Sequence, residues 1–272
     1  MTQAVPVLMY HHVSPQPGLV TVSPETFEEH MAYLARKKYH ALAADEFLEF
    51  LQGKRALGSR SVLITFDDGY LDNYVYAWPI LKRYGLKATI FAITGLVGEG
   101  AARTYLGAAK VLPATPDHRS CKAAITEGRA DEVMLRWSEI ETMEASGAVE
   151  IHSHTHTHQR WDQLHADKSQ RLTTVEADLT ASRDALKRRL GKDSRHLCWP
   201  WGYFEEEYQA IAEKAGFAAQ YATAKGINIA GSNLRQIARM VVKDKPVGWL
   251  GSRLMIYRHT WMARLYLGLR GA

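Results

Sequence analysis

The sequence predicts an α/β fold built on a parallel sheet. Short apolar runs alternate with amphipathic helical segments along the chain, as in βα units joined by crossover helices. In the run over 61–66, Val62, Leu63 and Ile64 are contiguous, as expected of a strand buried on both faces. Segments with distinctive polar or aromatic side chains directly follow four of these runs: His11, Asp67 with Asp68, residues 152–158 and residues 200–202. The carboxyl ends of parallel strands share one rim, so these segments are expected to meet there.

The individual elements follow from apolar runs and from the residues that begin and end helices. The expected strands cover residues 5–10, 61–66, 87–93, 149–151, 197–199, 217–222 and 237–242. The expected helices cover residues 24–38, 46–51, a segment ending near 84 with a bend at Pro79, and residues 137–146, 167–190 and 205–215. Ser23 and Pro24 supply an N-cap and a first helical residue, and Gly191 supplies a C-cap.

Two parts of the chain do not fit the alternation. Residues 95–136 contain several glycines and prolines with little periodicity, and we expect a long irregular excursion with one or two short helices. After the last strand, apolar residues recur at helical spacing and predict a basic amphipathic helix at about 247–270. No internal repeat, low-complexity tract or linker divides the sequence, so residues 1–272 are expected to form a single domain.

Charge is distributed unevenly along the chain. The 272 residues carry a net charge of +5, with 46% hydrophobic and 23% charged residues, which is a globular composition. The segment 235–272 contains one acid, Asp244, and eight basic residues: Arg235, Arg239, Lys243, Lys245, Arg253, Arg258, Arg264 and Arg270. Because the remaining body is slightly acidic, we expect no nucleic-acid partner. Cys121 and Cys198 are too far apart in sequence to suggest a zinc ribbon or a disulfide scaffold.

The sequence also bears on location. The N-terminal residues have no basic segment followed by a long apolar run, and no stretch reaches the roughly 18–20 apolar residues of a membrane span. We therefore expect a cytoplasmic protein. The basic C-terminal helix would suit a peripheral contact with the inner face of the membrane. The alternative is a helix that closes the fold, with its apolar stripe in the core and its arginines in solvent.

Asp67 and Asp68 form a carboxylate pair at the end of the predicted strand over 61–66. Adjacent side chains on an extended chain point in different directions, so the two carboxylates are not expected to do the same job. One could bind a metal ion while the other acts as a general base beside it. The alternative is an ordinary turn, because Asp-Asp-Gly is common turn chemistry.

A histidine run follows the predicted strand over 149–151. His152, His154, His156 and His158 alternate with other residues, and imidazoles combined with one carboxylate leave open coordination positions, as in catalytic metal sites. In a strand all four side chains would share one face, whereas on a helical turn His154 and His158 would align. The alternative is adventitious metal binding by a tag-like tract.

Four stretches of the sequence resemble motifs of the polysaccharide deacetylases, also called the NodB-homology or carbohydrate esterase family 4 proteins. The stretch Thr65-Phe66-Asp67-Asp68-Gly69-Tyr70 resembles their first motif. Residues 154–158 are similar to the second, H-[ST]-x-x-H, residues 199–202 resemble the third, and residues 7–13 resemble an opening strand found in one branch. The resemblance implies the NodB-homology fold, a distorted, TIM-like (β/α) barrel with seven strands.

The resemblance also implies roles for particular residues. Asp68, His154 and His158 would hold one divalent metal ion, and Asp67 would be the catalytic base. Zinc is the default metal, with cobalt, nickel, manganese and iron not excluded. The substrate-binding or oxyanion residues would be Tyr70, Pro200 and Trp201. His152 and His156 match nothing in the motif. Aromatic side chains expected at the rim, where they could stack on sugar rings, are Tyr70, Trp161, Trp199 and Trp201.

Two departures from the family pattern affect the site. The third motif usually has an arginine two residues before its proline, where it steadies the catalytic aspartate, and here that position is Cys198. Arg239, after the last predicted strand, is the expected substitute, with Arg195 as a second candidate. The C-terminal Leu-x-His that usually supplies the general acid is also absent. The histidine after the opening strand is expected to take that role, which identifies His11 as the acid and His12 as its alternative.

The implied activity is metal-dependent hydrolysis of an N-acetyl group from an amino sugar in a glycan or glycolipid precursor, with release of acetate. Two other functions remain open on sequence grounds. One is a glycan-binding barrel that has lost catalysis, and the other is a metal-dependent phosphoesterase. The sequence identifies neither the acetylated glycan nor the oligomeric state.

Overall fold

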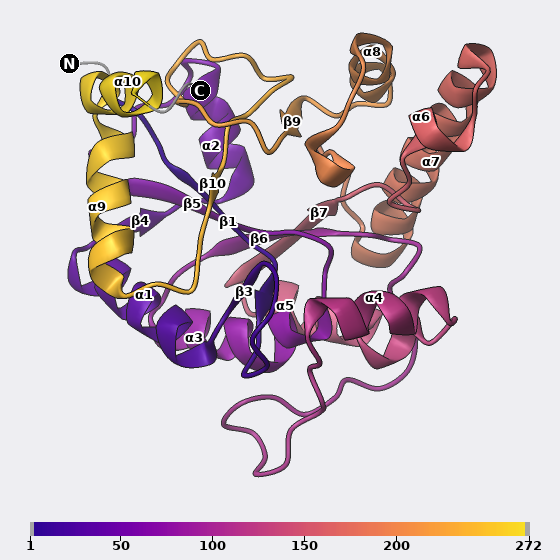
Figure 1. Ribbon diagram of the computed structural model, residues 1–272, viewed down its shortest axis with the longest axis horizontal. Coiled ribbons are helices and arrows are strands. Elements are labelled where there is room, and N and C mark those ends of the chain that lie inside the picture. The colour runs from indigo at the N-terminus through magenta and orange to yellow at the C-terminus, as the bar shows by residue number, and fades with distance from the viewer. Residues whose placement is uncertain (1–2, 270–272) are drawn as a thin grey trace.

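The computed structural model describes residues 3–269, and a curved parallel sheet lies at its centre (Figure 1). Along the main path of this sheet the strand order is β10-β1-β5-β6-β7-β8-β9. These seven strands are β1 (Val7–Tyr10), β5 (Ser61–Phe66), β6 (Ala88–Ala92), β7 (Val149–Ser153), β8 (His196–Cys198), β9 (Ala219–Tyr221) and β10 (Met240–Val241). A short strand, β4 (His40–Ala41), pairs with the start of β5. The predicted strands are thus all present.

One short segment contacts both edges of the sheet. Ile237 forms a parallel bridge with Tyr221 of β9, and three residues later Met240 pairs with Leu8 of β1. Helices surround the strands (Figure 1). This arrangement confirms the expected distorted α/β barrel with seven parallel strands.

The helices agree with most of the predicted boundaries. They are α1 (Pro24–Arg36), α2 (Ala44–Leu51), α3 (Trp78–Arg83), α4 (His118–Thr126), α5 (Trp137–Ala145), α6 (Trp161–Leu164), α7 (Lys168–Leu190), α8 (Glu206–Lys214), α9 (Val247–Arg258) and α10 (Thr260–Gly268). The Ser23 side chain caps α1, and Gly191 ends α7 in the left-handed region with φ 66°. The bend expected near Pro79 is a π-helical turn, η1 (Asn73–Ala77), that leads directly into α3.

The excursion over 95–136 is largely irregular but carries α4 and a 3-10 turn, η2 (Ala130–Glu132). The Asp117 side chain accepts hydrogen bonds from the first turn of α4. A two-stranded ribbon of β2 (His12–Val13) and β3 (Thr21–Val22) was not expected from the sequence.

The C-terminal helix differs from the prediction. The segment expected as one helix at about 247–270 is two helices, α9 and α10, because His259 leaves the helical conformation at φ −110° and ψ 110°. Leu250, Leu254 and Tyr257 of α9 are buried, whereas Ala263 is the buried residue of α10. The apolar stripe of α9 thus belongs to the core. Arg270 and the last two residues lie outside the described part of the chain.

The core has apolar residues on both faces of the sheet. Leu8 and Ile64 pack into one cluster with α1 and α3, while Val7 and Leu63 pack into another with α2 and β9. Neighbouring strand residues point to opposite faces, so both clusters need contiguous apolar strands. Within residues 3–269, no helix combines the length and the apolar character needed to cross a membrane.

Candidate active site

The carboxyl ends of β1, β5, β7 and β8 meet around a small cavity, called here the rim cavity. Its volume is about 180 Å³. The residues that line it are His11, Leu19, Val20, Asp67, Asp68, His118, Lys122, His154, Trp199, Trp201, Gly202 and Thr223. The predicted convergence of distant segments at one rim is therefore present in the structure.

Asp68, His154 and His158 form one group that could hold a metal ion. The Oδ1 atom of Asp68 lies 3.3 Å from Nε2 of His154 and 3.4 Å from Nε2 of His158. The His154 Nδ1–H donates to the carbonyl oxygen of Cys198 at 2.7 Å, which orients the ring so that Nε2 is the nitrogen that faces Asp68. Two imidazoles and one carboxylate fit a catalytic site for a divalent metal ion.

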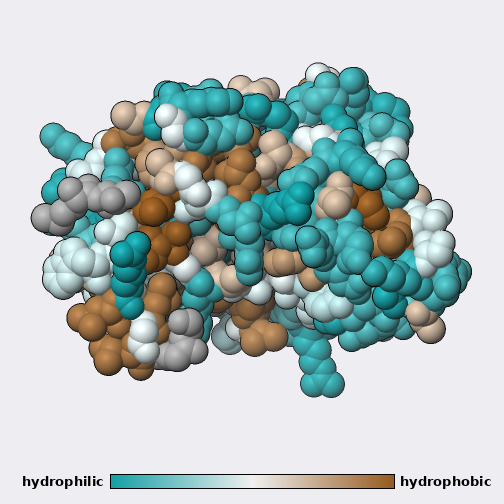
Figure 2. Space-filling view, turned by 90° about the horizontal axis from the view of Figure 1, so that it is seen from above, coloured by the Kyte–Doolittle hydropathy of each residue, from teal (hydrophilic) through white to brown (hydrophobic). Residues whose placement is uncertain are grey.

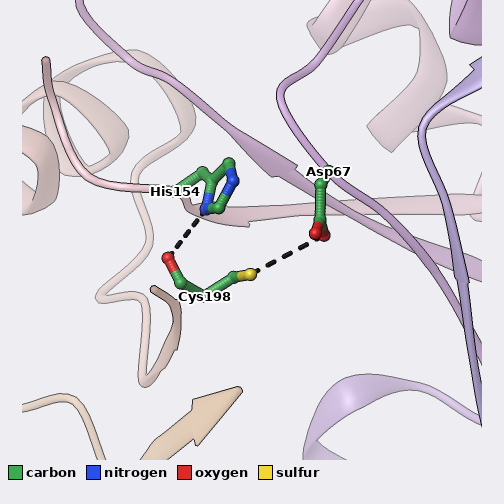
Figure 3. A group of neighbouring side chains, drawn as sticks. All are labelled: Asp67, His154 and Cys198. Carbon is green, nitrogen blue, oxygen red and sulfur yellow. Dashed lines mark hydrogen bonds between the residues drawn. The ribbon is translucent and has the colours of Figure 1, made fainter. Parts of the chain in front are cut away.

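A second group with metal-ligand chemistry consists of Asp67, His154 and Cys198 (Figure 3). It fits a metal ion less well, because both carboxylate oxygens of Asp67 already accept hydrogen bonds from Arg239. Burial raises the pKa of the Cys198 thiol, and the thiolate is the form that binds metal. Since His154 is common to both groups, the group with Asp68 and His158 is the better ligand set.

Asp67 is held by a bidentate ion pair. Arg239 Nη1 lies 2.6 Å from Oδ1 and Nη2 lies 2.8 Å from Oδ2, and both side chains are buried. Burial opposes ionisation of Asp67, but the charge and hydrogen bonds of Arg239 outweigh it and lower the pKa of the carboxyl. Cys198 lies 3.1 Å from Arg239 Nη2. Arg239 therefore occupies the position expected for a substitute arginine, while Arg195 pairs with Asp45 instead.

The two candidate acids lie in different environments. His11 lines the rim cavity, with Nε2 3.8 Å from Asp67 Oδ2. Burial lowers the pKa of His11 below its ordinary value, despite the nearby carboxylates. His12 is fully buried, and its ring nitrogens bond Asp72 at 2.6 Å and His118 at 3.1 Å. The geometry therefore favours His11 over His12.

The histidine run forms a turn after β7. Asp178 of α7 accepts the backbone N–H groups of His156 and Thr157 at 2.6 and 3.0 Å, and this anchors the loop that carries His158. His156 Nδ1 contacts the Thr94 hydroxyl at 3.0 Å. In this turn His154 and His158 lie beside Asp68, whereas His156 contacts Thr94. In an extended strand the three side chains would share one face.

His152 lies at the other end of the run, within β7. Its Nδ1 bonds the Ser194 hydroxyl at 2.9 Å, and its ring packs against that of His196, with centroids 4.6 Å apart. His152 is buried and does not line the rim cavity. It therefore has a packing role, in keeping with its absence from the family motif.

Some expected substrate-binding residues do not reach the rim cavity. Tyr70 is 2% exposed, stacks on the ring of His12 with centroids 3.9 Å apart, and has its side chain in contact with that of Asp68. Pro200 is buried in the turn η3 (Pro200–Gly202). Trp161 is also buried, because aromatic residues here fill the core. Trp201 is 54% exposed and lines the cavity, with Lys122 Nζ 4.1 Å above its ring.

Several residues at the site have left-handed backbone conformations. Asp68, His158 and Trp201 have φ values of 73°, 56° and 61°. Such conformations are costly for residues other than glycine and cluster at functional sites. Gly202 also has positive φ, and a Cβ atom there would collide with the Thr223 side chain. The rim is thus held in a conformation that the surrounding fold imposes.

Three polar residues near the site were not found by sequence reasoning. His118 and Lys122 of α4 line the rim cavity, and His118 continues the hydrogen-bonded series from Asp72 through His12. Burial, together with the charge of His12, lowers the pKa of His118 to about 4. Asp178 anchors the histidine loop from α7. The four-residue spacing of His118 and Lys122 was the one available signal, because it puts both on one helix face.

The chain matches the family model described as "Polysaccharide deacetylase" over residues 54–220, which is more than half of its length. The protein YxkH of Bacillus subtilis, named among the polysaccharide deacetylases, is 29% identical over 222 residues, covering 82% of this chain and 65% of the relative. The poly-beta-1,6-N-acetyl-D-glucosamine N-deacetylase of Staphylococcus aureus is 26% identical over 228 residues, covering 82% of this chain and 68% of the relative. The chain thus spans about two thirds of the length of these curated relatives.

Solved structures show the same fold. The deacetylase PplD of Streptococcus pyogenes, solved with acetate, has a TM-score of 0.75 and 21% identity, covering 93% of this chain and 99% of that one. IcaB of Ammonifex degensii has a TM-score of 0.71 and 23% identity, with coverages of 93% and 97%. The barrel is therefore the NodB-homology fold that the motifs implied. By its motifs, its fold and the match over 54–220, the chain belongs to the polysaccharide deacetylase family.

Proposed function

We propose that the protein is a metal-dependent deacetylase that hydrolyses the N-acetyl group of an amino sugar in a glycan or glycolipid precursor. The observation that carries the proposal is the pairing of two adjacent aspartates with different partners. Asp68 faces two imidazoles, and Asp67 is held ionised by Arg239. The name of the Staphylococcus aureus relative, a poly-beta-1,6-N-acetyl-D-glucosamine N-deacetylase, supports this substrate class.

Asp68, His154 and His158 would be the ligands of the metal ion. A divalent ion held by them, for which zinc is our first choice, would supply Lewis-acid chemistry that polarises the carbonyl and lowers the pKa of water. Asp67 accepts the proton of the attacking water, and Arg239 fixes the orientation of its carboxylate. The hydroxide oxygen adds to the acetamide carbon. The backbone N–H of Trp201 is our candidate donor to the resulting oxyanion.

Breakdown of the tetrahedral intermediate requires a proton on the sugar nitrogen. Because burial lowers the pKa of His11, His11 is largely neutral when the reaction begins. We propose that His11 receives the proton that Asp67 has taken and delivers it to the departing amine as the C–N bond breaks. The products are acetate and a free amino sugar, and Asp67 returns to its ionised form.

Trp201, Pro200 and Tyr70 have different roles in this proposal. The exposed ring of Trp201 can stack on a pyranose face, and Pro200 fixes the turn that presents Trp201. Tyr70 does not touch substrate in this proposal. It supports Asp68 and His12 from behind the site.

Replacing His154 with alanine should abolish tight metal binding. The variant loses one of three protein ligands, so we expect a loss of at least 10-fold in zinc affinity, measured by metal analysis after dialysis. The matched control is His156→Ala, since His156 lies two residues away and contacts Thr94 instead. Unchanged zinc content in His154→Ala would show that the ligand set is wrong.

The two other functions make different predictions for a substrate panel. Purified zinc-loaded protein should release acetate from N-acetylglucosamine oligomers or conjugates and should leave phosphate esters intact. A phosphoesterase would give the reverse pattern, and a binding barrel would retain glycans without turnover. The ionised Asp67 favours the enzyme, because a binding protein has no use for a general base held beside a metal site.

We further propose a cytoplasmic location at the inner face of the membrane, with α10 as the contact. Trp261 and Leu265 are each 59% exposed, and Leu269 is 79% exposed. Arg264 lies among them on the same helix. Figure 2 shows hydrophobic residues gathered at the lower left, at the end of the molecule where Figure 1 places α9 and α10. Apolar and aromatic residues mixed with arginines suit the interface of an anionic bilayer.

Vesicle co-sedimentation tests this contact. The protein should pellet with vesicles containing anionic lipids at low salt, and the double variant Trp261→Ser/Leu265→Ser should remain in the supernatant. Val111→Ser is the matched control, because Val111 is 82% exposed in the excursion over 95–136. If the wild-type protein does not pellet even at low salt, the membrane contact is excluded and α10 has a packing role.

A further inference from the structure

A second and larger cavity adjoins the rim cavity. We call it the basic cavity, and its volume is about 410 Å³. Its lining residues come from β10, the loop after β9, α9 and α10: Thr223, Lys225, Arg239, Met240, Val241, Lys243, Trp249, Arg253, Tyr257, Tyr266 and Leu267. Thr223 lines both cavities. Arg239 lines the basic cavity and binds Asp67, which itself lines the rim cavity. The two cavities are thus direct neighbours.

The basic cavity has an unbalanced positive charge. Asp67 matches the charge of Arg239, but Lys225, Lys243 and Arg253 also line the cavity, and no acidic residue does so within residues 3–269. Within the described residues, none of these three cations forms an ion pair. A concave surface lined by charges of one sign attracts an oppositely charged ligand.

The walls of the basic cavity combine these cations with aromatic rings. The Arg253 guanidinium lies 5.5 Å from the ring centroid of Trp249 and 4.9 Å from that of Tyr266. Stacking on two rings restricts Arg253 and leaves its N–H edge available for an anion. Aromatic surface of this kind also suits a sugar face or an apolar chain.

We propose that the basic cavity binds a phosphate ester attached to the acetylated sugar whose acetamide enters the rim cavity. This inference rests on the deacetylase function proposed above and specifies its substrate as a phosphorylated or phosphate-linked N-acetyl amino sugar. A phosphate ester offers several strong acceptor oxygens and up to about two negative charges, which match three separate cations better than a single carboxylate does. Because Thr223 lines both cavities, a phosphate in the basic cavity would lie close to the sugar whose acetamide enters the rim cavity.

Calorimetric titration of the zinc-loaded full-length protein with N-acetylglucosamine 1-phosphate tests the site. The double variant Lys225→Gln/Lys243→Gln should bind this sugar phosphate at least 10-fold more weakly than the wild-type protein, since two charge-assisted contacts are lost. Binding should also weaken with increasing salt. The matched control is Lys245→Gln, which removes an exposed lysine of the same segment outside the cavity.

The comparison ligands separate the sources of binding. Neutral N-acetylglucosamine should bind equally to the wild-type protein and the double variant, and an N-acetylated disaccharide with a uronate should bind more weakly than the phosphate. If the double variant binds the sugar phosphate as tightly as the wild-type protein does, the proposal is wrong, because the two lysines then contribute nothing to binding. Uronate binding as tight as phosphate binding would also overturn it.

Turnover measurements distinguish this inference from the function on which it rests. If neutral oligomers are deacetylated and phosphorylation of the sugar leaves kcat/KM unchanged, the deacetylase function stands and the phosphate site is wrong. If the lysines govern sugar-phosphate binding but no acetamide is hydrolysed, the phosphate site stands and the deacetylase function is wrong. A kcat/KM about 10-fold higher for the phosphorylated sugar, lost in the double variant, is the expected result.

Discussion

Substitution of Asp67 by asparagine is expected to reduce kcat by roughly 10²–10⁴-fold, the usual contribution of a general base. Asparagine has nearly the same shape as aspartate but cannot take a proton from water. Its side chain does not belong to the Asp68, His154 and His158 group, so the zinc content should stay at the wild-type level. Acetate release and metal analysis on the same preparation measure both effects.

A matched carboxylate control for this variant is Asp45→Asn. Asp45 is an exposed residue that pairs with Arg195 and His196 away from the rim cavity, and its loss should leave kcat unchanged. If Asp67→Asn keeps most of the wild-type activity, Asp67 is not the base. If it loses zinc as well, the division of work between the two aspartates is wrong.

Substitution of Arg239 by methionine should have the largest effect on stability. It leaves the Asp67 carboxylate buried without its cationic partner, and breaking one side of a buried ion pair costs about 3–5 kcal/mol. The free energy of unfolding, measured by urea denaturation at neutral pH, should fall by that amount.

The loss should depend on pH in a defined direction. In the wild-type protein Arg239 lowers the pKa of Asp67, so the ion pair stabilises the fold above the ordinary carboxyl pKa and is lost as pH falls through the lowered value. In Arg239→Met the guanidinium no longer lowers the pKa of Asp67, so burial raises the pKa of this carboxyl. As the pH falls, Asp67 becomes protonated and the variant should therefore recover stability. Because catalysis needs the ionised form of Asp67, the increase of kcat with pH should occur at higher pH in the variant than in the wild-type protein.

The double variant Arg239→Met/Asp67→Asn provides the control for stability. Removing the unpaired charge should restore much of the lost free energy of unfolding, so the two substitutions should be strongly non-additive. Arg239→Lys retains a cation without the bidentate contact and should lie between the wild-type protein and Arg239→Met. Additive effects of the two substitutions would contradict a direct Asp67–Arg239 interaction.

Much of the fold follows from local sequence. The apolar run at β5 and the Ser23-Pro24 start of α1 both depend on nearest neighbours, and the structure has both where they were expected. The common rim follows from topology, because parallel strands place His11, Asp67 and His154 at the same edge. The role of Arg239 could be predicted because Cys198 stands where the family usually has the arginine that steadies the catalytic aspartate. Another arginine was therefore expected beside Asp67.

Other features depend on contacts between residues far apart in the chain. Tyr70 carries no sequence signal that it would stack on His12 instead of facing substrate. His118 reaches the rim cavity only because the irregular excursion folds α4 back across the barrel end. The break between α9 and α10 at His259 interrupts a continuous apolar period. Periodicity describes one helix at a time, and packing against the rest of the barrel decides these positions.

Zinc-loaded protein incubated with β-1,6-linked N-acetylglucosamine oligomers, with and without a phosphate ester, provides the most direct measurement. Acetate and free amine should appear in equal amounts, stop when the metal is removed by chelation, and resume when zinc is added back. Folded, zinc-loaded protein that releases no acetate from any of these sugars would contradict the assignment of Asp67, Asp68, His154 and His158 to a deacetylase site.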